Sequence, residues 1–90
     1  MRAKAIVNPA SSNGSTGKQW PMMEEKLRRA IGDVDAALTA GPGEAVEMTR
    51  RALRDGYDWI ISVGGDGTLN EVVNGFFAGA FRLPAHDLLG

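Results

Sequence analysis

The 90-residue sequence has no cysteine, which excludes disulfide bridges, thiolate zinc sites and cysteine nucleophiles. It has little net charge, because ten basic and eleven acidic residues are interspersed, and this balance gives no basic footprint for nucleic acid. No apolar run is long enough to cross a bilayer, and the amino terminus lacks the apolar core of a signal peptide. We therefore expect a soluble, cytoplasmic chain with no nucleic-acid partner.

A second histidine is also missing, so His86 has no partner for a histidine metal pair and is expected in a loop. The length fits a single domain, and the sequence does not specify an oligomeric state. Basic residues near the ends of two expected helices complement the helix dipoles. An alternative is that they form one basic face for anionic lipid head groups, which would give peripheral membrane association. These residues are Arg28, Arg29, Arg50, Arg51 and Arg54.

Apolar periodicity predicts three strands that alternate with three helices. Pro21 is expected in the first turn of the first helix, where its missing N–H is tolerated, and Gly56 is expected as a left-handed cap of the second helix. This order predicts a parallel sheet with right-handed crossovers, which is an α/β layered fold. The expected strands are 3–7, 33–39 and 57–63; the expected helices are 19–31, 44–55 and one that carries apolar residues at 69, 72, 73, 76 and 77.

Two connections could bring the backbone close to a ligand. Residues 10–18, "ASSNGSTGK", are small and polar throughout, as expected of a loop after the first strand. Residues 64–67, "GGDG", join the third strand to the last helix. Glycines there could take positive φ and bring N–H groups to a ligand, while the helix amino terminus adds partial positive charge. The turn therefore predicts a phosphate site. The alternative is a tight turn in which Asp66 or Thr68 only caps the helix.

Polar residues follow the glycine turn on the last helix. Asn70, Glu71 and Asn74 are expected opposite the apolar stripe, and amides there favour a hydrogen-bonding role over a solvated face. Asp66 could hold a water of Mg²⁺, since this ion is typically bound by one or two carboxylates together with phosphate and water. The alternative is a capping carboxylate without a metal.

Two common phosphate-binding patterns do not fit the sequence. The stretch "GSTGK" at 14–18 would need glycine at Ser12 and a hydroxyl at Gln19 to form a P-loop. Neither Gly65 nor Gly41 begins a complete GxGxxG pattern. An ordinary P-loop enzyme and an ordinary dinucleotide-binding dehydrogenase are therefore not supported.

The segment "GGDGTLNEVVNG" at 64–75, together with "VNPASSNGSTGK" at 7–18, resembles the diacylglycerol kinase catalytic-domain family, which includes bacterial lipid kinases and sphingosine kinases. The short glycine turn alone is shared with NAD kinases and 6-phosphofructokinases. The resemblance implies a Rossmann-like parallel-sheet domain that binds ATP against a second, β-rich domain and phosphorylates a lipid hydroxyl with Mg²⁺. Residues 1–90 then form the amino-terminal part of the nucleotide-binding domain, and 88–90 would begin its next strand. The general base, the main metal ligands and the membrane-facing lipid site would lie in the absent part, so this fragment alone is expected to be inactive.

The resemblance also implies a set of ATP-binding positions. Ser12 stands where the family usually has glycine, and Thr39 matches a threonine near ATP, although it could simply end a strand. Asp66 would be the metal residue. The alternatives to a lipid kinase are an NAD kinase-like enzyme and a non-catalytic nucleotide-binding module. The expected ATP-binding residues are Asn8, Pro9, Ala10, Ser11, Ser12, Thr39, Gly65, Asp66, Gly67, Thr68, Leu69, Asn70 and Glu71.

Overall fold

Three parallel strands and three helices alternate along the chain, as the sequence predicts. The computed structural model describes residues 2–80, with side chains as far as Phe77. His86 and the expected strand start at 88–90 lie outside the described residues. The α/β class is confirmed. The elements are β1 (Ala3–Val7), α1 (Ser15–Ile31), β2 (Val34–Leu38), α2 (Glu44–Arg54), β3 (Trp59–Val63) and α3 (Asp66–Ala80).

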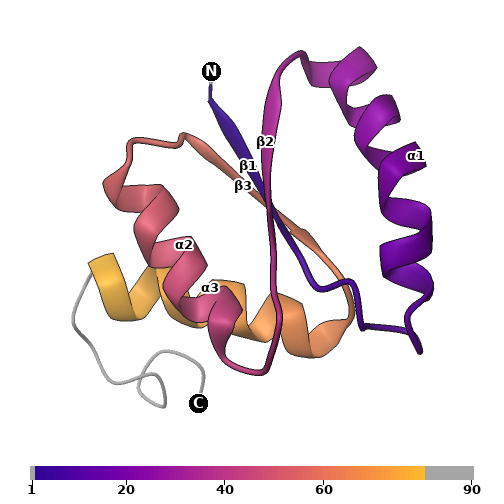
Figure 1. Cartoon of the computed structure of the whole chain (residues 1–90). Coiled ribbons are helices and arrows are strands. Elements are labelled where there is room, and N and C mark those ends of the chain that lie inside the picture. Colours follow the sequence, from indigo (N-terminus) through magenta and orange to yellow (C-terminus); the bar gives the residue numbers. More distant parts are fainter. Residues whose placement is uncertain (1, 81–90) are drawn as a thin grey trace.

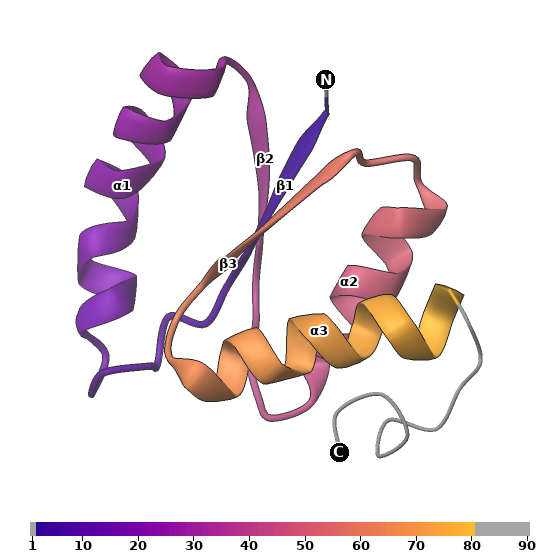
Figure 2. The same cartoon turned by 180° about the vertical axis from the view of Figure 1, so that it is seen from behind.

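The sheet has the strand order β2-β1-β3, and both pairs are parallel. Helix α1 covers one face of the sheet, and α2 and α3 lie together on the other face (Figures 1 and 2). Neighbouring residues of β1 point to opposite faces. Val7 packs into the core under α1, whereas Ile6 packs with Ala45 and Val72 under α2 and α3. Since all three strands run the same way, their carboxyl ends share one edge of the sheet.

Helix α1 begins four residues earlier than the sequence predicts, at Ser15 instead of residue 19. The loop expected over 10–18 is therefore too long, and Pro21 lies inside the helix instead of in its first turn. A proline there removes the hydrogen bond to the Gly17 carbonyl. Buried Thr16 and Trp20 hold the first turns of α1 against the rest of the domain, so tertiary packing extends the helix across the proline.

Helix α2 begins at the residue that the sequence predicts, Glu44, and ends one residue earlier than expected, at Arg54. Glu44 lies in its first turn and Arg54 in its last, where their charges complement the helix dipole. Gly56 follows the helix with φ +87°, in the left-handed region expected for a glycine cap.

Helix α3 buries only part of the apolar stripe expected from its sequence. Val72 is buried, but Leu69 and Phe76 are 52% and 38% exposed. Thr68 and Gly75, which do not belong to the stripe, are buried together with Val72. Gly75 explains why this face of α3 is buried, because the absence of a side chain there lets α3 approach the backbone of α2 closely. Glu71 lies beside this buried face, so the expectation that it lies opposite the packed side was wrong.

The five arginines do not form one basic face. Arg28 and Arg29 belong to α1, whereas the other three belong to α2 on the opposite side of the sheet (Figure 1). Arg28 and Arg29 pair with glutamates one helical turn earlier, and Arg50 and Arg54 both pair with Glu47. The split between two faces contradicts the basic-face alternative. Within residues 2–80, no helix combines the length and the apolar character needed to cross a bilayer.

Candidate functional site

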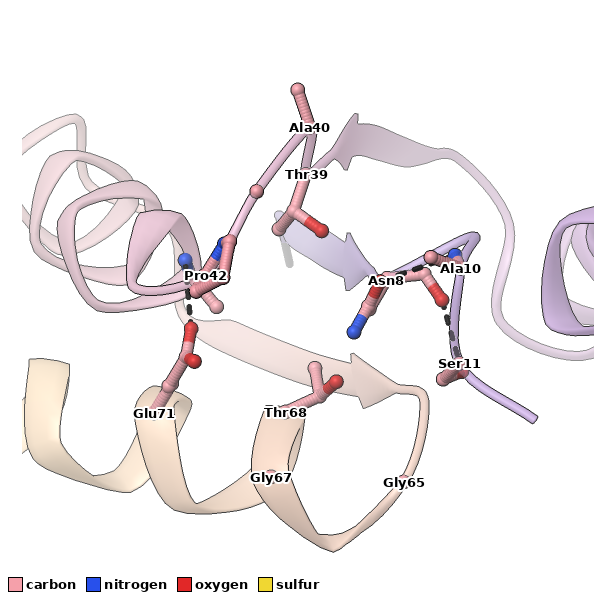
Figure 3. A pocket seen from close by; sticks show the side chains of 12 residues that line it. Asn8, Ala10, Ser11, Thr39, Ala40, Pro42, Gly65, Gly67, Thr68 and Glu71 are labelled. Atoms are coloured by element: carbon pink, nitrogen blue, oxygen red, sulfur yellow. Dashed lines mark hydrogen bonds between the residues drawn. The ribbon is translucent and has the colours of Figure 1, made fainter. Parts of the chain in front are cut away.

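A cavity of about 380 Å³ lies at the carboxyl ends of the three strands. Loops after β1 and β2 form two of its walls, and the first turns of α3 form the third (Figure 3). This is the edge at which parallel α/β sheets bind their ligands. Of the thirteen residues expected at ATP, the cavity brings together Asn8, Ala10, Ser11, Thr39, Gly65, Gly67, Thr68 and Glu71.

The wall after β1 is fixed by hydrogen bonds around Asn8. The Asn8 backbone N–H donates to the Val63 carbonyl at 2.9 Å, which ties the loop to β3. Its side-chain oxygen accepts the Ala10 N–H at 3.1 Å, which forms a local turn. The side-chain nitrogen points into the cavity (Figure 3). Because the oxygen is already bonded, Asn8 offers the cavity hydrogen-bond donors.

The hydroxyl of Ser11 closes this loop onto α1. It lies 2.5 Å from the buried Thr16 hydroxyl and donates to the Asn8 carbonyl at 2.9 Å. Pro9 does not line the cavity; its carbonyl accepts the Gly17 N–H at 3.0 Å. Pro9 therefore joins the loop to the first turn of α1.

Ser12 also lies outside the cavity lining. It takes φ +54°, and Asn13 follows with φ +58°. These values lie in the left-handed region that favours glycine. The position where the resembled family usually has glycine is thus one where the backbone conformation prefers glycine.

The glycines of residues 64–67 leave open space, but none of them has a positive φ. Among the described glycines, positive φ occurs at Gly14, Gly32, Gly43 and Gly56, so the expectation of positive φ in residues 64–67 was wrong. The glycines of the turn instead remove side chains. A Cβ at Gly64 would collide with the Thr68 side chain, 2.9 Å from its Cβ. Gly65 and Gly67 both line the cavity, and a Cβ on either of them would meet no protein atom within 4 Å. The space beside both residues is therefore open.

Thr68 has a buried hydroxyl that no protein group satisfies. The residue is only 4% exposed, and its Oγ1 atom is buried without a hydrogen-bond partner. Figure 3 shows its side chain extending from the first turn of α3 toward Asn8. An unpaired buried hydroxyl is unfavourable by about 1–3 kcal/mol. A ligand that accepts or donates a hydrogen bond here would remove that penalty.

The first turn of α3 adds backbone donors to the same place. The first N–H groups of a helix have no partner inside the helix, and the helix dipole gives this end partial positive charge. Asp66, Leu69 and Asn70 belong to this turn or the next, but they are exposed and do not line the cavity. The backbone of Gly65, Gly67 and Thr68 is therefore better positioned to contact a ligand in the cavity than the side chains of Asp66, Leu69 and Asn70.

The wall after β2 contains residues that the sequence alone did not single out. The buried Thr39 ends the strand, and its N–H donates to the Val7 carbonyl at 2.8 Å. The residues after it are small or apolar, and the Glu44 side chain accepts the Ala40 N–H at 2.8 Å. The sequence did contain a signal for this wall, the helix- and strand-breaking residues Gly41, Pro42 and Gly43. They follow a strand that ends at the same edge of the sheet, so a loop at the cavity could have been expected there. The missed lining residues are Ala40, Gly41, Pro42 and Ala45.

Glu71 joins two of these walls. Its carboxylate accepts the Gly43 N–H at 3.2 Å and the Ala45 N–H at 3.3 Å. Both donors belong to the start of α2, whereas Glu71 belongs to α3. The contacts hold the two helix starts in a fixed relation at the cavity.

The described residues contain no group of three or more histidine, cysteine, aspartate or glutamate side chains arranged to hold a metal ion. Asp66 is the first residue of α3 and is exposed. A single exposed carboxylate could serve as one ligand of a Mg²⁺ ion whose other ligands are water and phosphate. It could not hold the ion by itself. The fit of this metal therefore depends on a phosphate ligand.

The parallel sheet, the helices on both faces and the cavity at the carboxyl edge define the class of α/β domains that bind ligands outside the ends of their strands. Within this class, the chain belongs to the diacylglycerol kinase catalytic domain family, whose model matches residues 2–86. This confirms the family resemblance.

Individual relatives agree with the family model. The chain is 40% identical over 74 residues to a diacylglycerol kinase of Staphylococcus carnosus and 42% identical over the same length to one of Staphylococcus aureus. Each match covers 82% of this chain and 24% of the relative. A solved structure of a candidate diacylglycerol kinase from Bacillus anthracis is 30% identical, with a TM-score of 0.71, and the match covers 82% of this chain and 26% of that one. The chain thus spans about a quarter of the length of the relatives it matches.

Proposed function

We propose that this chain is the ATP-binding part of a lipid kinase that transfers the γ-phosphoryl group of ATP to the hydroxyl of a diacylglycerol-like lipid. In this proposal residues 1–90 form the amino-terminal part of the nucleotide-binding domain. Family membership supports the reaction class. The observation that carries the ATP site is the buried, unpaired hydroxyl of Thr68 at the start of α3.

The phosphate end of ATP fits the first turn of α3 best. Open space above Gly65 and Gly67 lets phosphate oxygens approach the backbone N–H groups without a Cβ between them. The Thr68 hydroxyl would donate to a further oxygen, and the helix dipole favours the negative charge. Hydrogen bonds to charged oxygens are about twice as strong as neutral ones. Two kinds of donor and the positive end of the helix dipole therefore meet at one place.

The Asn8 wall faces this turn across the cavity. Its side-chain nitrogen supplies another donor, and the rigid Asn8 turn keeps that donor in place. Pro9, Ser12, Leu69 and Asn70 support the walls or lie outside them in this proposal, although the resemblance placed them among the ATP-binding positions. The contacting set proposed from the cavity is Asn8, Ala10, Ser11, Thr39, Gly65, Gly67 and Thr68.

Phosphoryl transfer depends mainly on the position of the reacting groups and on stabilisation of charge. The chain would contribute both at the phosphate end, through the α3 backbone and Thr68. Bound Mg²⁺ would neutralise phosphate charge, with Asp66 contacting it through water. The general base and the lipid site belong, in this proposal, to the rest of the protein, and residues 1–90 alone transfer no phosphate.

The test is the Thr68→Val variant, which keeps the side-chain volume and removes the hydroxyl. We expect a Kd for Mg-ATP about tenfold higher, because a charge-assisted hydrogen bond is lost. Stability should not fall, since the buried hydroxyl has no protein partner. The readout is the amide shifts of Gly65, Gly67 and Thr68 in nuclear magnetic resonance titrations with Mg-ATP.

Thr49→Val is the matched control. Thr49 is also a buried threonine, on α2, and its hydroxyl donates to the Ala45 carbonyl without lining the cavity. Its replacement should leave the Kd for Mg-ATP unchanged. If Thr68→Val binds Mg-ATP as tightly as the unsubstituted chain, or if Mg-ATP shifts no amide in the α3 turn, the proposed site is wrong.

A further inference from the structure

We infer that Glu71 is a positioning residue that determines which end of the cavity receives the phosphates. This inference rests on the proposed function, because it concerns the orientation of ATP in the proposed site. The family resemblance placed Glu71 among the ATP-binding residues. The geometry assigns it a different role, in which it acts on the wall of the cavity through the start of α2.

The start of α2 has no cap of its own. Its N-cap residue is Gly43, at φ +84°, and this residue has no side chain to accept the first helical N–H groups. Glu71 supplies the missing acceptor from α3, 28 positions along the chain from Gly43. Each of its two oxygens accepts one N–H of the α2 start, from Gly43 and from Ala45. Figure 3 shows the bond to Ala45. The cap is therefore a tertiary contact between the two helices.

This cap makes the two helix starts at the cavity chemically different. The α2 start already holds a carboxylate, so an added phosphate would meet a like charge and lose backbone donors. The α3 start has no side-chain acceptor among the described residues, and Gly65 and Gly67 leave open space beside it. Asp66 in the first turn of α3 is exposed and does not line the cavity, so the α3 end is better suited to an anion than the α2 end.

The wall held by Glu71 suits an uncharged group. Ala40, Pro42 and Ala45 line it, and their side chains carry no polar atoms. The Glu44 side chain fixes the same wall by accepting the Ala40 N–H. In this arrangement the nucleoside end of ATP contacts the wall after β2, and the triphosphate contacts the α3 turn. Glu71 would affect ATP binding through the position of that wall, without contacting the nucleotide.

Two probes separate this role from a direct contact. Mg-ATP uses both ends of the cavity, whereas Mg-tripolyphosphate uses only the phosphate end. For Glu71→Ala we expect a Kd for Mg-ATP about tenfold higher, because the wall loses two hydrogen bonds to a carboxylate. The Kd for Mg-tripolyphosphate should be unchanged or lower, because a negative charge is removed. Thr68→Val should weaken the binding of both probes.

Two further variants complete the experiment. Glu71→Gln keeps one acceptor oxygen, so its Mg-ATP Kd should lie between those of the unsubstituted chain and Glu71→Ala, and it serves if Glu71→Ala does not fold. Glu47→Ala removes the same charge from the exposed side of α2 and should change neither Kd. In the ligand-free protein, the amide resonances of Gly43 and Ala45 should move in Glu71→Ala and stay in place in Glu47→Ala.

The possible results are distinguishable. If the unsubstituted chain binds neither probe, the proposed function fails and this inference fails with it. If the chain binds both probes and Glu71→Ala weakens both equally, Glu71 acts on the phosphates or on the whole fold, and only the inference fails. Unchanged binding of Mg-ATP by Glu71→Ala would also overturn it.

Discussion

Replacement of Gly75 by alanine tests the close packing of α3 on α2. A Cβ at this position would lie 2.6 Å from the Val46 carbonyl oxygen and 2.7 Å from the Thr49 Cβ. Both atoms belong to the α2 backbone or to a fully buried side chain, so the helices must move apart. Overpacking of this kind costs about 1–3 kcal/mol, and the tightness of these contacts places Gly75→Ala at the upper end. Alanine regains up to about 1 kcal/mol through its higher helix propensity.

The expected net loss for Gly75→Ala is therefore about 2 kcal/mol of unfolding free energy. In a domain of this size, it corresponds to a fall in Tm of roughly 10 °C. Thermal unfolding followed by circular dichroism measures the change, and urea unfolding gives the free energy independently. The separation of α3 from α2 should also weaken Mg-ATP binding, because Glu71 would no longer be aligned with the N–H groups at the start of α2.

Gly67→Ala is the matched change in the same helix. A Cβ at Gly67 would meet no protein atom within 4 Å, so this variant should unfold at the same temperature as the unsubstituted chain or a higher one. Its methyl group would occupy open space beside a residue that lines the cavity, so Mg-ATP should bind about tenfold more weakly. If Gly75→Ala and Gly67→Ala change Tm equally, the packing argument for Gly75 is refuted.

Three further predictions concern the loop after β1, the glycine turn and the opposite end of the sheet. Ser12→Gly should raise the unfolding free energy by about 1 kcal/mol in urea titrations, because Ser12 has φ +54°; an unchanged midpoint would contradict this. Gly64→Ala should displace Thr68 and weaken Mg-ATP binding in the same titration as Thr68→Val; equal Kd values for Gly64→Ala and the unsubstituted chain would rule out this contact. The hydrogen bond from the Tyr57 hydroxyl to the Asp35 carboxylate raises the pKa of Tyr57 above 10.0. Its stabilising effect is therefore present at neutral pH and is lost as the pH rises through the raised pKa, so the difference in unfolding free energy from Tyr57→Phe should shrink in alkaline solution.

The sequence by itself determined the α/β class, the order of the elements and the family. Strand and helix patterns are local, since they follow from the spacing of apolar residues and from breakers such as Gly41 and Gly56. The parallel arrangement follows from the alternation of strands and helices, and it places the ends of β1, β2 and β3 at one edge. Eight of the thirteen residues expected at ATP line the cavity for this reason.

Only the tertiary structure decided which face of α3 is buried and how the cavity walls are held. The apolar spacing pointed to Leu69 and Phe76, but Gly75 allows a closer approach to α2 than a larger side chain would, and this approach selects the face with Thr68 and Val72. The contact from Glu71 to the start of α2 joins residues 28 positions apart, and no local pattern encodes it. The orphaned Thr68 hydroxyl likewise depends on everything packed around it, because an unpaired polar atom is defined by its neighbours and not by its sequence.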